Sequence, residues 1–155
     1  MAGEHDLVLA PASGAEAVTL VGGWRVTVGF SIPPRWPPWA STSRPASYEG
    51  DTGGPTPDGV WRAWLDRASL GGRVYVRTRR PGDRFQPLGM AQAKKLQDFF
   101  TDSRVPRDWR DRVPLLVSEG GIAWVVGWRI AHWAKVGAEW PDGAAAFSVT
   151  FEQVL

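Results

Sequence analysis

The sequence predicts an α+β fold: a β-rich, layered, sandwich-like domain with one or two short helices inserted mid-chain. Three observations favour this class: short β-prone runs separated by glycine pairs, one amphipathic helical segment, and a composition of 43% hydrophobic and 22% charged residues. A length of 155 residues suits one compact domain, so we expect residues 1–155 to form a single unit.

The first expected elements are two β-prone runs, Ala17–Val21 and Trp24–Phe30, separated by Gly22-Gly23. Two glycines between alternating apolar runs predict a β-hairpin. Residues 31–58 then contain seven prolines, which exclude a regular helix or a central strand. We expect this Pro/Gly-rich loop to be an insertion, because connections inside compact domains are seldom so long.

The middle of the chain combines two strands with a turn. Val60–Leu65 alternates apolar and polar residues, which is typical of a strand. Within Arg73–Thr78, Val74 and Val76 share one face, as in a half-buried strand. The tripeptide Pro81-Gly82-Asp83 predicts a turn after this strand.

Helices are expected after this turn. Across Gln92–Ser103, the apolar residues Leu96, Phe99 and Phe100 stand at positions i, i+3 and i+4, which places them on one face of a helix. Residues 106–114 are expected to form a second short helix, because proline suits the first helical position.

The last part of the chain returns to strands. Leu115–Val117 and Ile122–Val126 flank Glu119-Gly120-Gly121, which predicts a second hairpin. Ala146–Phe151 is expected to be the final strand, because it is rich in β-branched and aromatic residues.

Charge is concentrated in one stretch, Arg73–Arg112, here called the basic segment. It holds eleven basic and five acidic residues, a formal charge of +6, whereas the 72 residues before it and the 43 after it each carry −2. Clustered Arg and Lys with Phe and Trp between them indicate a polyanionic partner such as nucleic acid. A solvated charged face is the alternative that composition leaves open.

Tryptophan is abundant, with ten residues in the chain. Because its large ring fills the core of β-rich domains, we assign Trp24, Trp61, Trp64 and Trp124 to the core. Trp109 lies inside the basic segment and could instead be a stacking platform for a base.

Several kinds of site are excluded by residue type. The chain has no cysteine, and its two histidines, His5 and His132, are too few for a His-based metal site. We find no signal peptide and no apolar run of membrane length, so we expect a cytoplasmic protein without a membrane contact. No catalytic residue is expected, since neither a Cys nor a convergent His completes a site.

From Leu65 to Ile130 the chain carries an ordered series of short motifs. They are Leu65-Asp66, Val76-Arg77-Thr78-Arg79-Arg80-Pro81-Gly82-Asp83-Arg84-Phe85, Pro87-Leu88-Gly89, Lys94-Lys95-Leu96-Gln97-Asp98, Pro106 to Arg110, Pro114-Leu115, and Trp124-Val125-Val126-Gly127-Trp128-Arg129. The series resembles the C-terminal region of bacterial tRNA(Ile)-lysidine synthetases. It departs from that pattern at Ala93, where the family often has glycine.

The resemblance implies a layered β-sandwich similar to a domain of the phenylalanyl-tRNA synthetase β-subunit. Enzymes of this family use ATP to couple lysine to the wobble cytidine of a minor isoleucine tRNA. Their Ser-Gly-Gly-x-Asp-Ser pyrophosphate loop is absent from this sequence. We therefore expect the tRNA-holding part without a cofactor of its own, with ATP and Mg serving a separate N-terminal catalytic domain. A homodimer of the full-length enzyme is a further candidate assembly.

Arginine and lysine are the candidate tRNA-binding residues, because the planar fork of arginine binds phosphate oxygens in pairs. The candidates are Arg77, Arg79, Arg80, Arg84, Lys94, Lys95, Arg107, Arg110 and Arg129. Structural roles stay open for some of them. Arg110 could be tied to Asp83 or to backbone carbonyls, and Arg129 could serve packing. Lys94 could pair with Asp98 on the helix surface, while Asp83 is expected to cap its turn.

A second functional class stays open beside tRNA binding. Trp36 and Trp39 in the Pro/Gly-rich loop could anchor a protein or a carbohydrate on a Trp-rich β module. Salt distinguishes the two classes, because phosphate binding weakens steeply as salt rises whereas stacking on a sugar barely changes.

Overall fold

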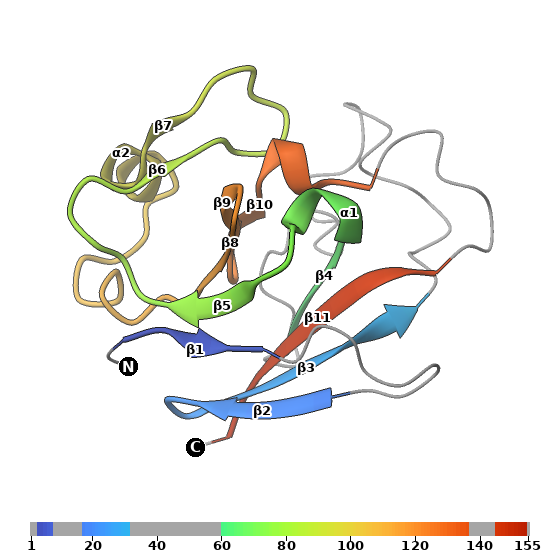
Figure 1. The fold of residues 1–155 in the computed structure, drawn as a ribbon. Helices are drawn as coiled ribbons and strands as arrows, with labels where there is room; N and C mark the ends of the chain where they lie inside the picture. The colour runs from blue at the N-terminus through green and yellow to red at the C-terminus, as the bar shows by residue number, and fades with distance from the viewer. Residues whose placement is uncertain (1–2, 8–16, 32–59, 137–144, 155) are drawn as a thin grey trace.

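The computed structural model describes residues 3–7, 17–31, 60–136 and 145–154, so the predicted loop lies outside these ranges except for Ser31. Two antiparallel sheets form the framework (Figure 1). One has the strand order β1 (His5–Asp6), β5 (Val74–Arg77), β8 (Leu115–Ser118), β9 (Gly121–Val125), β10 (Arg129–Ile130). The other has the order β2 (Ala17–Val21), β3 (Trp24–Ser31), β11 (Ala146–Gln153), β4 (Val60–Leu65).

Short elements connect the strands of these sheets. They are α1 (Arg67–Leu70), the two-stranded pair β6 (Arg84–Phe85) and β7 (Lys94–Lys95), α2 (Leu96–Asp102), and the 3-10 helix η2 (His132–Ala134). The predicted β-rich α+β class with short mid-chain helices is therefore confirmed. In Figure 1 the β6–β7 pair and α2 lie at the opposite end of the molecule from the four-stranded sheet.

Both glycine-centred hairpins are confirmed. β2 and β3 pair as far as Val21 opposite Trp24, and the intervening Gly22 and Gly23 have φ values of 51° and 87°. A type I′ hairpin turn needs positive φ at both central residues, which glycine adopts without strain. The second hairpin joins β8 to β9, with Ser118 opposite Gly121.

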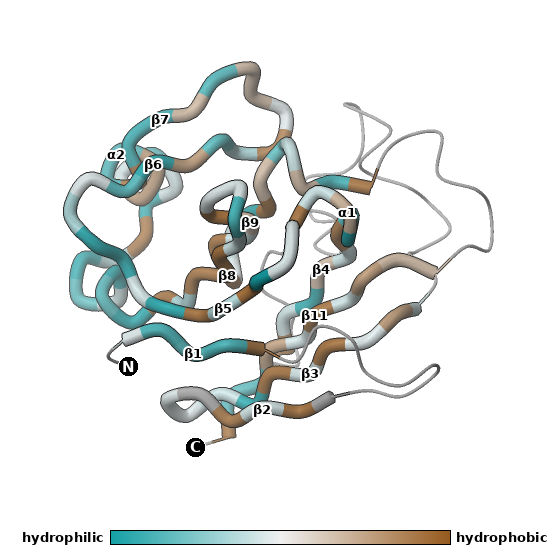
Figure 2. The backbone as a smooth tube through the Cα atoms, viewed as in Figure 1, coloured by the Kyte–Doolittle hydropathy of each residue, from teal (hydrophilic) through white to brown (hydrophobic). Residues whose placement is uncertain are grey.

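Aromatic rings from both sheets pack against one another in the core between them. Trp24 of β3 and Trp124 of β9 both contact Phe151 of β11, with ring centroids 6.0 and 5.4 Å apart. Because these rings come from both sheets, the sheets are stacked as layers of a sandwich. In Figure 2 hydrophobic residues lie along β8 and at several positions of β11, whereas the segment around β6, β7 and α2 is largely hydrophilic.

The assignment of tryptophans to the core is correct for two of the four. Trp24 and Trp124 are buried, and Trp61 is partly buried against the core. Trp64 is also partly buried, but it is not among the residues packed against the core and its Nε1 donates to Ser31 Oγ at 2.9 Å, so its assignment to the core was wrong. Alternation along β4 turns the neighbours of Trp64 inward, and Trp64 itself must then point outward.

The helical predictions hold only in part. α2 begins at Leu96 rather than at Gln92, because the two preceding lysines pair with β6 and Leu96 N donates to Asp83 O at 2.9 Å. Residues 106–112 form hydrogen-bonded turns, not the predicted helix. Their backbone hydrogen bonds, such as Trp109 N to Pro106 O and Arg112 N to Trp109 O, span three residues, as in turns, whereas an α-helix needs bonds that span four.

Candidate nucleic-acid interface

A tight turn connects β5 to β6 and positions the basic side chains around it. Pro81 and Gly82 are its central residues, and Asp83 N donates to Arg80 O at 3.2 Å. Gly82 has a φ of 84°, the positive value that a type II turn requires at this position. The predicted turn is confirmed, and it places Arg80 before and Arg84 after the reversal of the chain.

A bidentate ion pair lies beneath this turn. Arg77 donates through Nη1 and Nη2 to Asp83 Oδ2 and Oδ1, at 2.9 and 3.0 Å. The side chains of Arg77 and Asp83 are 10% and 12% exposed, and hydrogen bonding to Asp83 raises the pKa of Arg77 above its ordinary value. Asp83 Oδ2 also accepts from Arg80 N at 2.8 Å, so this carboxylate caps the turn as expected.

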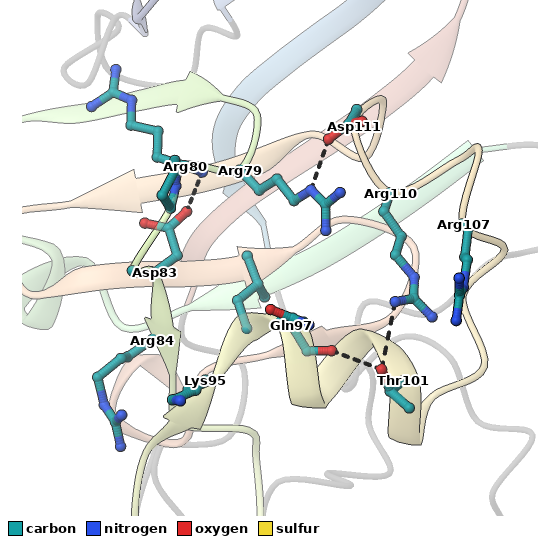
Figure 3. Close-up of a pocket in the computed structure, with 13 residues that line it drawn as sticks. Arg79, Arg80, Asp83, Arg84, Lys95, Gln97, Thr101, Arg107, Arg110 and Asp111 are labelled. Atoms are coloured by element: carbon teal, nitrogen blue, oxygen red, sulfur yellow. Dashed lines mark hydrogen bonds and ion pairs between the residues drawn. The ribbon is translucent and has the colours of Figure 1, made fainter.

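An open cavity of about 880 Å³ lies between this turn, β7, the start of α2 and residues 107–111. Six basic and two acidic side chains line it, which gives a formal charge of +4. We call it the basic cavity, and its six bases, shown in Figure 3, are Arg79, Arg80, Arg84, Lys95, Arg107 and Arg110. The structure thus brings together six of the nine candidate binding residues.

Two of these bases face each other across the β6–β7 pair. Arg84 and Lys95 are directly opposed in antiparallel register, so their side chains project from the same face. Arg84 Nη2 donates to Ala93 O at 3.2 Å, whereas the side chains of Lys95 and Arg107 have no hydrogen-bond or ion-pair partner within the described ranges. Like charges placed directly opposite destabilise a strand pair, and an anion bound between them would remove that repulsion.

Two further bases of the cavity are paired with acids. Arg79 Nε donates to Asp111 Oδ1 at 2.7 Å, across the cavity lining. Arg80 Nη1 lies 3.0 Å from Glu4 Oε2, on the segment that contains β1. Sequence reasoning missed Glu4, because nothing in the local pattern of residues 1–7 points to a contact with the basic segment.

The Arg110 side chain is held by hydrogen bonds to a backbone carbonyl and to a hydroxyl. Its Nε donates to Val105 O at 2.9 Å, which confirms the alternative of a tie to a backbone carbonyl, and its Nη1 lies 3.5 Å from Thr101 Oγ1. Gln97 and Thr101 of α2 also line the cavity and add neutral polar groups to it. These two were missed, although their i, i+4 spacing places them together on one face of the helix.

Three candidate residues do not reach the cavity. Arg77 is committed to Asp83 in the interior. Lys94, on β7, forms an ion pair with Asp102 at the end of α2 instead of with the expected Asp98. Arg129 is half-buried on β10 and does not line the basic cavity.

Trp109 does not present a free ring. It is partly buried against the core, and the Arg112 guanidinium lies over it at 4.3 Å from the ring centroid. One face of the ring is thus covered by a cation, which argues against the stacking platform. Trp36 and Trp39, the candidate anchors for a protein or carbohydrate, lie outside the described residues.

The described residues offer neither a metal site nor a membrane-spanning helix. Among the described residues, no three His, Asp or Glu side chains come together in a way that could bind a metal ion. Within the same ranges, every helix is too short or too polar to cross a membrane.

Comparisons with known proteins agree with the sequence resemblance. Residues 74–141 match the family described as the TilS substrate C-terminal domain. The tRNA(Ile)-lysidine synthase of Dehalococcoides mccartyi is 54% identical over 74 residues, which are 48% of this chain and 16% of that protein. That of Geobacter sulfurreducens is 35% identical over 119 residues, which are 77% of this chain and 21% of that protein.

A solved structure shares the fold. It is described as the crystal structure of TILS C-terminal domain, and it aligns with a TM-score of 0.57 and 24% identity over 90% of this chain and 92% of that one. The curated relatives are much longer than this chain, which spans only 16% and 21% of the two proteins compared above.

Proposed function

We propose that this chain binds tRNA through its basic cavity, because residues 74–141 match the family described as the TilS substrate C-terminal domain and its relatives are tRNA(Ile)-lysidine synthases. The observation that supports this most directly is the opposed pair of Arg84 and Lys95, two cations on one face. A phosphate bound there would accept charged hydrogen bonds from both side chains and remove their repulsion.

The surrounding lining suits the backbone of double-stranded RNA. A-form RNA is recognised mainly through its phosphates, its 2′-hydroxyls and its shape, because side chains cannot enter its deep major groove. Arg107 has no acidic partner in the described ranges, and Arg110 is held facing the same cavity. In this proposal these contacts supply affinity that depends on salt, and they do not read the base sequence.

A finer role follows for the whole protein. We propose that this chain holds the body of a minor isoleucine tRNA while a part of the protein outside these 155 residues couples lysine to the wobble cytidine. ATP and Mg would serve that other part, since the pyrophosphate loop Ser-Gly-Gly-x-Asp-Ser is absent here. The chain would then contribute binding in the cytoplasm, with neither catalysis nor a cofactor of its own.

The test is fluorescence anisotropy with labelled, unmodified minor isoleucine tRNA at about 50 and about 200 mM salt. We expect binding at the lower salt that weakens by about tenfold or more at the higher salt, because phosphate contacts release counterions. Absence of binding at the lower salt would refute autonomous tRNA binding by this chain.

Neighbouring lysines provide a matched pair of variants. Lys95→Ala removes a cation of the basic cavity, and we expect it to weaken binding about threefold to tenfold at low salt. Lys94→Ala makes the same chemical change at a residue that is paired with Asp102 outside the cavity lining. We expect its dissociation constant to stay within about twofold of the unchanged chain, since its charge is already compensated. Equal losses in both variants would contradict the assignment of the cavity.

A further inference from the structure

A short acidic segment lies next to the basic cavity. Residues 3–7 carry Glu4 and Asp6, and β1 pairs with β5 through His5 opposite Val76. Leu7 N donates to Val74 O at 3.0 Å, and the Leu7 side chain is only 6% exposed. This apolar anchor fixes the segment beside the start of the basic segment.

The two acids of this segment have different partners. Glu4 Oε1 accepts from Arg73 Nη2 at 2.9 Å, and Glu4 Oε2 lies 3.0 Å from Arg80 Nη1. Asp6 pairs with Arg73 alone among the described residues, at 2.7 Å. Arg73 does not line the basic cavity, whereas Arg80 does. Of the two acids, Glu4 is thus the one that neutralises a cation of the cavity.

The geometry of Arg80 shows what this contact does. Its backbone N is fixed by Asp83 Oδ2, while its side chain extends away from Arg84 and Lys95 in Figure 3. The Arg80 side chain is 48% exposed and that of Glu4 is 29% exposed. The guanidinium can therefore exchange partners without any rearrangement of the core.

We infer that Glu4 competes within the molecule for Arg80, so that an RNA phosphate in the basic cavity gains this arginine only by displacing the Glu4 carboxylate. The inference rests on the proposed function, because it concerns the same cavity. Hydrogen bonds from Arg73 and Arg80 lower the pKa of Glu4, which keeps the carboxylate ionised at neutral pH. An exposed ion pair is weak and screened by salt, whereas arginine binds phosphate through two parallel hydrogen bonds, so the exchange favours the ligand.

Glu4→Gln is the variant that tests this competition, with Asp6→Asn as its matched control. Both remove one negative charge from the same segment and from a partner of Arg73, but only Glu4→Gln frees Arg80. At about 50 mM salt we expect Glu4→Gln to bind minor isoleucine tRNA about threefold to tenfold more tightly, because the phosphate then gains Arg80 without displacing a carboxylate. Asp6→Asn should change the affinity by less than about twofold.

A second background shows whether the gain passes through Arg80. Arg80→Ala and the double variant Glu4→Gln/Arg80→Ala should bind equally well if the only effect of Glu4 is on Arg80. Equal gains in Glu4→Gln and Asp6→Asn would overturn the inference in favour of a general charge effect. So would a gain from Glu4→Gln that persists without Arg80. Thermal unfolding of each variant checks that the segment remains folded.

A titration with inorganic polyphosphate separates this inference from the proposed function. If tRNA does not bind but Glu4→Gln strengthens polyphosphate binding in an Arg80-dependent way, the tRNA role fails and the competition stands. If tRNA binds and Glu4→Gln changes neither ligand, the tRNA role stands and the competition is refuted.

Discussion

At the scale of single residues, the Arg77–Asp83 pair stabilises the turn between β5 and β6. Its side chains are about nine-tenths buried, and Asp83 also accepts from Arg80 N at 2.8 Å. Asp83→Asn would leave a largely buried guanidinium without its counter-charge, and we expect a loss of about 2 to 4 kcal/mol in the free energy of unfolding. Urea unfolding of the two proteins measures this difference.

Asp111→Asn is the control for that substitution. It removes the carboxylate that pairs with Arg79, but the Asp111 side chain is 76% exposed. We expect a change within about 0.5 kcal/mol, because exposed ion pairs contribute little. Similar losses in Asp83→Asn and Asp111→Asn would show that burial of the Arg77 pair does not matter for stability.

We expect His132 to make the stability of the protein sensitive to mild acid. Its Nδ1 accepts from Gly89 N at 3.1 Å, a bond that only the unprotonated nitrogen can make. Burial lowers the pKa of His132 below its ordinary 6.5, and the charge of Lys135 lowers it further. The unfolded chain therefore binds this proton more readily, so acidification favours unfolding.

The lowered pKa of His132 sets the pH range in which stability should change. The His132 contribution should be complete above its ordinary pKa of 6.5 and should decline as the pH falls below that value. We expect Tm to drop between about pH 7.5 and about pH 5.5, and His132→Asn to reduce that drop because an amide oxygen can accept from Gly89 without titrating. An unchanged pH dependence in His132→Asn would assign the effect to other groups.

At the scale of elements, glycine positions decide where the chain reverses. Gly82 and Gly89 have φ values of 84° and 88°, and a Cβ at either would meet no atom within 4 Å. Alanine at either position therefore costs only backbone strain, about 1 to 2 kcal/mol. Gly82 lies between Arg80 and Arg84, two bases of the cavity. We therefore expect Gly82→Ala, but not Gly89→Ala, to weaken tRNA binding, by about threefold.

Gly89→Ala supplies the comparison for the binding measurement, because its turn lies outside the cavity lining. The two alanine variants should lose similar amounts of stability in urea unfolding, while only the Gly82 variant changes the anisotropy titration. Equal effects on tRNA binding would mean that the strain acts through global stability and not through the turn.

The elements that could be predicted are those encoded by local signals. Both hairpins carry glycine pairs, and β11 and β4 carry long β-prone runs. By contrast, β1, β6, β7 and β10 have two residues each, too few for an alternation to be seen. The start of α2 was misplaced for the same reason, since Lys94–Lys95 fits a helix until its tertiary partner β6 is known.

The candidate site shows the same limit. Most of its bases are close in sequence, flanking one turn or one short helix, so their convergence could be predicted from the motif order. The burial of Arg77 could not, because it depends on the fold of the turn around Asp83. Nor could Glu4 be found, since a contact such as Glu4–Arg73 joins residues 69 positions apart.

At the scale of the whole molecule, the basic cavity and the four-stranded sheet lie at opposite ends (Figure 1). The basic cavity carries a formal charge of +4. The four-stranded sheet lies at the far end in Figure 1, and on its outer face Arg25 is paired with Glu152 at 2.9 Å. If the whole protein attracted tRNA only through its net charge, the position of a removed cation would not matter.

Two double variants with the same change in net charge decide this point. Arg84→Ala/Lys95→Ala removes two cavity cations, and Arg25→Ala/Arg62→Ala removes two exposed arginines of the four-stranded sheet. The cavity variant should lower the log–log salt slope of tRNA binding by about 1.8, for two lost phosphate contacts, and weaken affinity by about tenfold or more at 50 mM salt. The sheet variant should keep the slope and lose at most about twofold in affinity. Equal slopes in the two variants would place the tRNA contacts elsewhere than in the cavity, because counterion release counts the phosphates contacted and not the total charge.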